Sequence, residues 1–252
     1  MKTIVITGAS SGIGYATAKA LAKGNRLILC GRRTERLQQL QKELTDTPTL
    51  LLTFDVAKKE EVFVAFATLP EEWKNIDVLI NNAGNAHGLA RFQDADLADL
   101  EAMIDINIKG VIYVTKACLP FFEKSKNAHI INLSSIAGKQ VYANGTTYCA
   151  SKWAVEALTK GMRLDFLPLG IKVTSVAPGA VETEFSLVRF KGDEKIAKKV
   201  YEGYIPLKAE DVAETLTFVV NQPEHVQLAD ITILPKAQAD GITFLKTSDF
   251  ND

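Results

Sequence analysis

The sequence is poor in cysteine and histidine, and it carries almost no excess charge. Its three cysteines, Cys30, Cys118 and Cys149, are odd in number and far apart, which excludes a disulfide framework and a cysteine metal cluster. The 29 basic residues are balanced by 30 acidic ones, so the net charge of -1 gives no general attraction to nucleic acid or to an acidic membrane. We therefore expect no nucleic-acid partner, no membrane partner and no metal.

Long hydrophobic runs are also lacking. No apolar stretch approaches the roughly 18 residues that a membrane-spanning helix needs. The apolar run after Lys2 breaks at Gly8, which is too early for a secretory signal, so we expect a cytoplasmic protein. The chain has no Pro/Gly/Ser linker, internal repeat or low-complexity run, which predicts that residues 1–252 form a single domain.

Short apolar runs alternate with longer amphipathic segments along the whole chain. This alternation predicts an α/β fold in which a doubly wound parallel sheet of about seven strands has helices on both faces. Ligands of such sheets bind beyond the carboxyl ends of the strands. The least regular stretch is 178–206, and we expect a mobile substrate flap near 180–206. The expected strands are 2–7, 26–30, 50–54, 77–80, 129–133, 172–176 and 230–234, and the expected helices are 13–23, 34–44, 60–68, 97–123, 148–166 and 211–221.

The segment ITGASSGIG at residues 6–14 joins the first expected strand to the first expected helix. Its glycines predict a phosphate-binding loop, because Gly8 permits a tight turn, Gly12 lets a phosphate approach the backbone, and Gly14 lets the helix pack on the strand. The helix that follows would present free N–H groups and a positive dipole end to a pyrophosphate.

The same loop also matches the G-x-S-x-G turn of serine hydrolases, with Ser10 as the nucleophile. That site needs a histidine base held by a carboxylate. His87, His129 and His225 are the available histidines, and none has such a context. A serine hydrolase therefore stays as a remote alternative to the phosphate loop.

Polar residues follow the next three expected strands. Arg32 and Arg33 end the second strand, where arginine accommodates the 2'-phosphate of NADP and an acidic residue would favour NAD. Asp55 and Val56 follow the third strand, and the Asn-Asn-Ala-Gly run at 81–84 follows the fourth. These positions predict a crevice for a flat ring, with a carboxylate that can accept a hydrogen bond from an adenine amine.

Tyr148 and Lys152 are spaced to project from one face of a helix. A nearby ammonium favours the phenolate, so this pair suits proton transfer near neutral pH. Ser135 follows the strand 129–133 and could stabilise a developing alkoxide at the same edge of the sheet. Asn107 could interrupt its long helix and hold a water that passes protons to Lys152.

Together these features resemble the short-chain dehydrogenase/reductase family. The resemblance rests on TGASSGIG, NNAG, the Ser135 to Tyr148-x-x-x-Lys152 spacing, Asn107 and Pro178-Gly179, in order over essentially the whole chain. It implies a single Rossmann-fold domain and a catalytic tetrad of Asn107, Ser135, Tyr148 and Lys152. It also implies a homotetramer packed largely through the helices that carry Asn107 and Tyr148. The NADP-binding residues that it implies are Gly8, Ser10, Ser11, Gly12, Ile13, Gly14, Arg32, Arg33, Asp55, Val56, Asn82, Ala83, Gly84, Tyr148, Lys152, Pro178, Gly179, Val181 and Thr183.

A closer similarity is to the NADP-dependent 3-hydroxy acid dehydrogenases that act on serine and allo-threonine. It rests on RRTERLQQLQKEL, LPEEWKNIDVLINNAG and VRFKGD. The resemblance implies hydride transfer between NADP and a secondary alcohol, with Ser135 and Tyr148 on the substrate. The segments 181–185 and 149–151 depart from that subgroup, so a carbonyl reductase of another substrate class stays an alternative.

Arg189 is the flap cation between apolar neighbours, which suits a substrate carboxylate, although an exposed arginine without a ligand fits equally well. A protein that binds NADP without catalysis is a further alternative for the whole chain.

Overall fold

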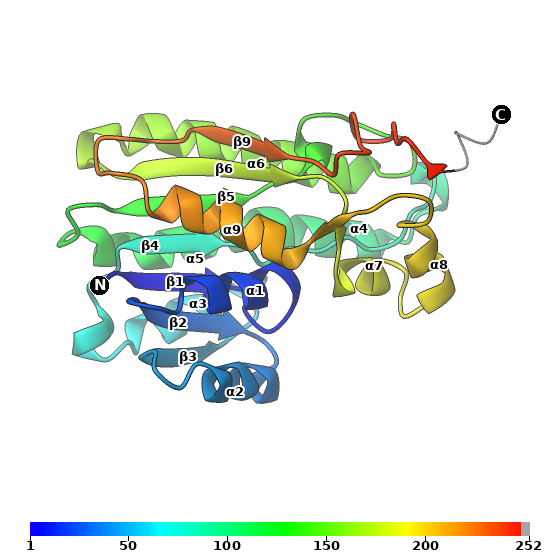
Figure 1. Cartoon of the computed structure of the whole chain (residues 1–252). Coiled ribbons are helices and arrows are strands. Elements are labelled where there is room, and N and C mark those ends of the chain that lie inside the picture. Colours follow the sequence, from blue (N-terminus) through cyan, green and yellow to red (C-terminus); the bar gives the residue numbers. More distant parts are fainter. Residues whose placement is uncertain (248–252) are drawn as a thin grey trace.

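The centre of the protein is a parallel sheet of seven strands in the order β3-β2-β1-β4-β5-β6-β9, as seen in a computed structural model that describes residues 1–247 (Figure 1). This arrangement confirms the predicted doubly wound α/β fold, and the strand order reverses between β1 and β4. The strands of the sheet are β1 (Thr3–Thr7), β2 (Arg26–Gly31), β3 (Thr49–Thr53), β4 (Val78–Asn81), β5 (His129–Leu133), β6 (Lys172–Pro178) and β9 (Asp230–Ile233).

Helices cover both faces of this sheet. The α-helices are α1 (Gly12–Leu21), α2 (Thr34–Glu43), α3 (Lys59–Ala67), α4 (Leu97–Ile104), α5 (Gly110–Cys118), α6 (Thr146–Asp165), α7 (Glu184–Arg189), α8 (Glu194–Lys199) and α9 (Ala209–Val220). Short 3-10 helices span Glu71–Trp73, Phe92–Asp94, Leu119–Phe122, Ile136–Gly138 and Leu167–Leu169. Within residues 1–247, no helix has both the length and the apolar character needed to cross a membrane.

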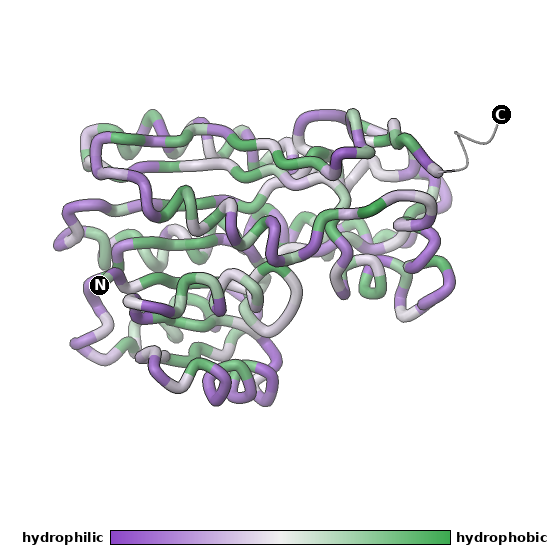
Figure 2. Tube along the Cα trace, in the orientation of Figure 1, coloured by the Kyte–Doolittle hydropathy of each residue, from purple (hydrophilic) through white to green (hydrophobic). Residues whose placement is uncertain are grey.

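The hydrophobic core lies in two layers, one on each side of the sheet. Ile4 and Ile6 of β1 face a cluster with α1, α2 and α9, whereas Val5 faces the opposite cluster with α3 and α5. Successive side chains of a strand point to opposite faces, so a strand buried on both sides is apolar at nearly every position. The hydropathy-coloured trace shows this concentration of apolar residues along the central strands (Figure 2).

The register of the strands brings their carboxyl ends to one edge of the sheet. Thr7 lies beside Cys30 of β2, and Ile6 lies beside Ile80 of β4. The loops that follow these three strands therefore start at the same level, although they are far apart in the sequence. This edge, at the point where the strand order reverses, is where ligands of open α/β sheets bind.

The sequence predicts one helix over 97–123, but the structure has four consecutive helical pieces there. A π-helical turn over Asp105–Lys109 separates α4 from α5, and Leu119–Phe122 is a 3-10 helix. The wider turn contains Asn107, whose amide bonds to the backbone of Asn85 outside the helix. The predicted interruption at Asn107 is therefore found. The second change, to the 3-10 helix at Leu119–Phe122, was not predicted, because the apolar pattern continues through it.

The flap is more regular than the sequence predicts. It contains β7 (Val181–Glu182), α7 and α8, and β7 pairs in parallel with β8 (Leu207–Lys208), which directly follows the flap. The side chain of Thr183 accepts a hydrogen bond from the backbone N–H of Phe185, and that of Asp193 accepts one from Ile196. Such N-caps stabilise helix starts, and they were the available sequence signal for these two short helices.

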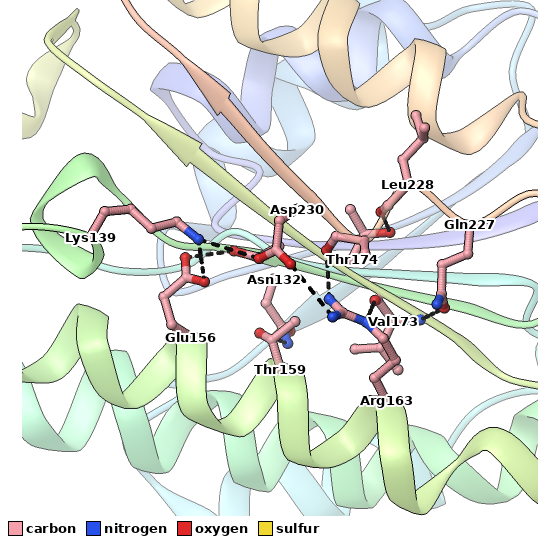
Figure 3. Close-up of polar contacts among 12 residues, drawn as sticks. Asn132, Lys139, Glu156, Thr159, Arg163, Val173, Thr174, Gln227, Leu228 and Asp230 are labelled. Atoms are coloured by element: carbon pink, nitrogen blue, oxygen red, sulfur yellow. Dashed lines mark hydrogen bonds and ion pairs between the residues drawn. The ribbon is translucent and has the colours of Figure 1, made fainter. Parts of the chain in front are cut away.

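A buried polar network fixes α6 against the sheet (Figure 3). Glu156 of α6 accepts a hydrogen bond from Ser175 of β6 at 2.7 Å and pairs with Lys139 at 2.7 Å. Arg163, two turns further along α6, donates to the backbone carbonyls of Val173 and Ala229. Because a buried charge that loses its partner is costly, these contacts hold the helix that carries Tyr148 and Lys152 in one position.

Candidate active site

A cleft of about 330 Å³ opens at the carboxyl ends of the central strands, within the range of roughly 300–1,000 Å³ that is common for ligand sites. It extends from the glycine loop to the flap and joins the segments that follow six strands, β1 to β6. Of the predicted site residues, those that line it are Gly8, Ser10, Ser11, Gly12, Ile13, Arg32, Arg33, Asp55, Val56, Asn82, Ala83, Gly84, Ser135, Tyr148, Lys152, Pro178, Gly179, Val181 and Thr183.

The glycine loop has the conformation that the sequence predicts. Gly8 and Gly12 have φ angles of +68° and +53°, which residues with a side chain rarely adopt. Ser11 is the N-cap residue of α1, but its side chain makes no capping hydrogen bond. The first turn of α1 therefore keeps backbone N–H groups available, which fits a pyrophosphate.

Gly14 lies behind this loop and does not line the cleft. A Cβ atom there would lie 2.4 Å from the carbonyl oxygen of Gly8 and 2.5 Å from Nδ2 of Asn82. Its role in this structure is therefore the close packing of α1 on the sheet. This close packing agrees with the role that the sequence predicts for Gly14.

The two arginines after β2 lie in different environments. Arg33 points into the glycine loop, where its guanidinium donates to Oγ of Ser10 at 3.1 and 3.2 Å and to Oγ of Ser11 at 2.6 Å. Arg32 forms a 3.4 Å ion pair with Asp55 and its side chain is 63% exposed. Arg33 is thus held by more hydrogen bonds than Arg32, and both side chains line the cleft.

Asp55 and Asn82 are tied to the backbone around the cleft. Oδ1 of Asp55 accepts a hydrogen bond from the backbone N–H of Ala57, which leaves Oδ2 beside Arg32. Nδ2 of Asn82 donates to the carbonyl of Thr7 at 2.8 Å. Asn82 therefore links the end of β4 to the end of β1 and fixes the width of the crevice.

Tyr148 and Ser135 meet at the inner end of the cleft. Both side chains are buried, and a hydrogen bond between them lowers the pKa of the phenol. Burial is the larger effect, however, and it raises the pKa of Tyr148 well above its ordinary value of 10.0. With only the protein's own groups around it, the phenol is therefore protonated at neutral pH, and Lys152 is not among the groups that lower its pKa.

Lys152 lies on the same face of α6, one turn beyond Tyr148. Its ammonium donates a 2.9 Å hydrogen bond to the carbonyl of Leu133, at the end of β5. A Cβ atom at Gly84 would lie 3.3 Å from this nitrogen, so the ammonium reaches the floor of the cleft. Burial lowers the pKa of Lys152 to about 8, and the negative charge of Glu156 partly offsets this effect.

This lowered pKa predicts a specific pH dependence of stability. The unfolded chain binds the Lys152 proton more tightly than the folded chain does, so this group adds stability as the pH rises from about 8 to its ordinary value of 10.5. We expect the free energy of unfolding, relative to a Lys152→Met variant, to rise over this interval by on the order of 3 kcal/mol.

Urea unfolding at several pH values would test this expectation. Lys160→Met is the matched control, because Lys160 lies on the same helix with an exposed side chain. Parallel pH profiles for the wild type and Lys152→Met would contradict the assigned pKa of Lys152.

Asn107 does not line the cleft, but it lies directly behind it. Its amide donates to the backbone carbonyl of Asn85 at 2.8 Å and to Oγ of Ser151 at 2.9 Å, and its oxygen accepts from the backbone N–H of Asn85. A Cβ atom at Gly84 would lie 3.1 Å from Oδ1 of Asn107 and close to Lys152. The side chain thus supports the loop after β4 beside the lysine.

Arg189 also lies outside the lining of the cleft, but next to Tyr148. Its guanidinium carbon is 5.5 Å from the centroid of the Tyr148 ring and 5.9 Å from that of Tyr142. The guanidinium donates to the backbone carbonyl of Gly88 at 3.0 Å and to the hydroxyl of Tyr142 at 3.4 Å. The flap therefore places one positive charge at the entrance to the predicted reaction centre.

The geometry disfavours a serine hydrolase. Oγ of Ser10 accepts hydrogen bonds from Arg33, which is not a base at neutral pH. His129 lies within the sheet, where its ring bonds to Thr174 and burial lowers its pKa to about 3. Among residues 1–247, no group of three or more His, Cys, Asp or Glu side chains could hold a metal ion.

The cleft also contains residues that the sequence interpretation omitted. Glu184 and Phe185 come directly after Thr183 and form the first turn of α7, and the Phe185 ring lies 5.7 Å from that of Tyr148. Ser134 lines the cleft beside Ser135, and its buried hydroxyl has no hydrogen-bond partner. The available sequence signal for Glu184 was Thr183, because an N-cap residue indicates that a helix begins at the next position.

Comparisons with known proteins agree with this geometry. A family model described as short chain dehydrogenase matches residues 2–193. The chain is 40% identical to an NADP-dependent 3-hydroxy acid dehydrogenase of Schizosaccharomyces pombe, over 94% of this chain and 93% of that protein. It is 42% identical to sulfoacetaldehyde reductase 2 of Chromohalobacter salexigens, over 94% of this chain and 95% of that protein.

Among solved structures, the chain is similar to the closed form of serine dehydrogenase complexed with NADP+. The TM-score is 0.92 and the sequence identity is 38%, with 96% of this chain and 98% of that chain covered. The expected resemblance in sequence therefore extends to the three-dimensional fold.

Proposed function

Because this chain belongs to the short-chain dehydrogenase family, we propose that it is an NADP-dependent oxidoreductase of small anionic hydroxy compounds, with 3-hydroxy acids as the first candidates. The observation that carries the proposal is one cleft that joins the glycine loop, Arg33, Tyr148 and Lys152. Two similar proteins support it: one is named an NADP-dependent 3-hydroxy acid dehydrogenase, and the other is a serine dehydrogenase complexed with NADP+.

The chemistry combines a hydride carrier with a proton donor. When bound, the nicotinamide of NADP supplies or accepts the hydride, and its oxidised form carries a positive charge. Gly8, Gly12 and the start of α1 would hold the pyrophosphate, and Arg33 would hold the 2'-phosphate. Pro178, Gly179, Val181 and Thr183, which line the same cleft, would flank the nicotinamide.

The protein's own residues would move the proton. In the reducing direction, Tyr148 is already protonated and can donate its proton to the carbonyl oxygen of the substrate. Ser135 would donate a hydrogen bond to the same oxygen as negative charge develops there. In the oxidising direction, Tyr148 must first lose its proton, and the positive charge of Lys152 would favour that phenolate. Asn107 would hold the loop after β4 against Lys152.

Two relatives indicate a common form of substrate. In a 3-hydroxy acid, one carbon separates the hydroxyl-bearing carbon from the carboxylate; in sulfoacetaldehyde, one carbon separates the carbonyl carbon from the sulfonate. In both compounds, the reacting carbon is thus separated from the anionic group by one carbon. Arg189 suits this pattern because its guanidinium lies 5.5 Å from the ring of Tyr148. A reductase of sulfonate aldehydes is therefore the second candidate.

An absorbance assay at the nicotinamide band would test the proposed function. The protein would be mixed with NADP and L-serine, L-allo-threonine, 3-hydroxyisobutyrate or isethionate, and with NADPH and sulfoacetaldehyde or simple uncharged ketones. We expect the highest kcat/KM with an anionic substrate. The absence of turnover with every compound would favour a binding protein without catalysis, and a preference for uncharged ketones would favour a carbonyl reductase of another class.

Replacement of Arg189 should separate binding of the anion from chemistry. We expect Arg189→Gln to raise KM for the best anionic substrate by about tenfold or more, because a charge-assisted hydrogen bond is worth about 1.5–3 kcal/mol. The kcat for an uncharged ketone should change by less than about threefold on this reasoning. Equal losses with both kinds of substrate in steady-state assays would contradict the role of Arg189.

We also propose a cytoplasmic homotetramer with a substrate flap over 180–206. Trp153 of α6 and Leu97 of α4 are 47% and 67% exposed, which supports a covered interface on these helices. The charged flap between β7 and β8 lies over the cleft, which supports its role in covering substrate. Sedimentation of the purified protein would test the tetramer.

A further inference from the structure

Glu184 of the flap reaches the start of α2 on the other side of the cleft. Its carboxylate pairs with Nη1 of Arg33 at 3.1 Å and with Nη1 of Arg36 at 2.7 and 2.8 Å. These partners lie about 150 residues away in the sequence, and the contact joins the first residue of α7 to the first turn of α2. The flap is thus fastened at the outer end of the cofactor cleft.

Arg33 connects this contact to the glycine loop. Three of its polar contacts go to the hydroxyls of Ser10 and Ser11, while Nη1 is directed to Glu184. Glu184 itself lines the cleft. The carboxylate therefore takes up the part of the guanidinium that faces the cleft, where an arriving anion would bind.

Because Glu184 is negatively charged, its contact with Arg33 competes with the binding of another anion. Burial raises the pKa of Glu184, but hydrogen bonds from Arg36 and Arg33 outweigh that effect and hold the pKa below its ordinary value of 4.5. The carboxylate is thus ionised at neutral pH. A phosphate monoester carries a charge of about −1.5 to −2 at this pH, so the two anions repel each other when they share one guanidinium.

We propose that Glu184 is a specificity-determining residue for the cofactor, because its carboxylate occupies Arg33 until a 2'-phosphate displaces it. The proposal rests on the assignment of Arg33 to the 2'-phosphate under the proposed function. A cofactor that lacks this phosphate leaves the Glu184 contact intact, whereas NADP must exchange it for a phosphate contact. Glu184 therefore lowers the preference for NADP over NAD, and Arg36 retains the displaced carboxylate.

A charge-neutral variant tests this role through binding rather than through activity. In Glu184→Gln, we expect the Kd values of NADPH and of 2',5'-ADP to fall about three- to fivefold, since an exposed ion pair is worth up to about 1 kcal/mol. The Kd values of NADH and 5'-AMP should change by less than about twofold. Cofactor fluorescence and calorimetry with the two nucleotides would give these values.

Glu182→Gln is the matched control. Glu182 lies in β7 of the same flap and is exposed, and within residues 1–247 it forms no ion pair. The variant removes the same charge from the protein without freeing Arg33, so all four Kd values should stay within about twofold of wild type. Tighter NADPH binding by both variants would overturn the proposal, because the effect would then be one of net charge.

Arg33→Gln distinguishes failure of the proposal from failure of the Arg33 assignment. If Arg33→Gln leaves the ratio of NADPH and NADH affinities unchanged, the assignment of Arg33 to the 2'-phosphate is wrong. If Arg33→Gln lowers that ratio but Glu184→Gln weakens NADPH, or changes both cofactors equally, only the role of Glu184 is wrong. Thermal unfolding of each variant would verify its fold, and Glu184→Ala provides the same loss of charge should the glutamine variant unfold.

Discussion

Replacement of Tyr148 by phenylalanine should lower kcat by at least about 10³-fold, because a positioned acid or base contributes roughly 10²–10⁴-fold and no other hydroxyl replaces this one. The cleft should remain intact, since the ring keeps its contact with Phe185, 5.7 Å away between centroids. The Kd of NADPH should therefore stay within about threefold of wild type. Steady-state kinetics and cofactor fluorescence would measure the two effects.

The control for this experiment is Tyr204→Phe. The hydroxyl of Tyr204 donates to the backbone carbonyl of Val200 in the flap and does not line the cleft. Its loss should leave kcat within about threefold. If Tyr148→Phe retained activity within about tenfold of wild type, the proton-transfer role of Tyr148 would be refuted.

The second large effect is expected at the arginines after β2. Replacement of both Arg32 and Arg33 by glutamine should lower kcat/KM for NADPH by about 100-fold or more, because each lost contact to a phosphate is worth about 1.5–3 kcal/mol. The value for NADH should fall by less than about threefold, since that cofactor has no 2'-phosphate. Rates measured with both cofactors and one substrate give the ratio directly.

The single variants divide this effect between the two residues. Arg33→Gln should account for most of the loss, because Arg33 is ordered by Ser10 and Ser11, whereas Arg32 is 63% exposed and pairs with Asp55. If the double variant left the ratio of the kcat/KM values for NADPH and NADH unchanged, the assignment of the 2'-phosphate to this site would be wrong. A larger effect of Arg32→Gln would reverse the two assignments.

The geometry also indicates how the state of the cofactor controls the proton donor. Burial keeps Tyr148 protonated when only protein groups surround it, and Lys152 is itself buried with a pKa lowered to about 8. The protein alone is therefore prepared for reduction. Oxidation requires the phenol to lose its proton first, so we expect it to need a higher pH than reduction, which pH profiles of kcat/KM in the two directions would measure.

The local sequence pattern was sufficient to place the site residues on the correct elements. Strands with both faces buried are apolar through their centres, as β1 is at Ile4, Val5 and Ile6, and polar residues follow their carboxyl ends. Tyr148 and Lys152 were predicted on one helix face, and they lie on α6 beside Ser135. The apolar strands and the positions of the site residues depend on local spacing, which can be read from the sequence.

The contacts that determine chemistry depended on long-range packing. The sequence indicated an ammonium near the phenol, but it could not give the burial that raises the pKa of Tyr148. It predicted one helix over 97–123, because the apolar pattern continues through the π-helical turn at Asp105–Lys109. It also gave no reason to link Glu184 to Arg33, since the ion pair forms only when the flap folds over the cleft.

The sequence by itself determined the parallel α/β fold, the glycine loop and the spacing of the Tyr148 and Lys152 pair, because hydrophobic period and backbone conformation are local properties. Only the tertiary structure decided that Arg33 and not Arg32 points into the loop, and that Arg189 lies over Tyr148. The physical reason is that burial, charge pairing and desolvation arise between segments that meet only in the folded chain.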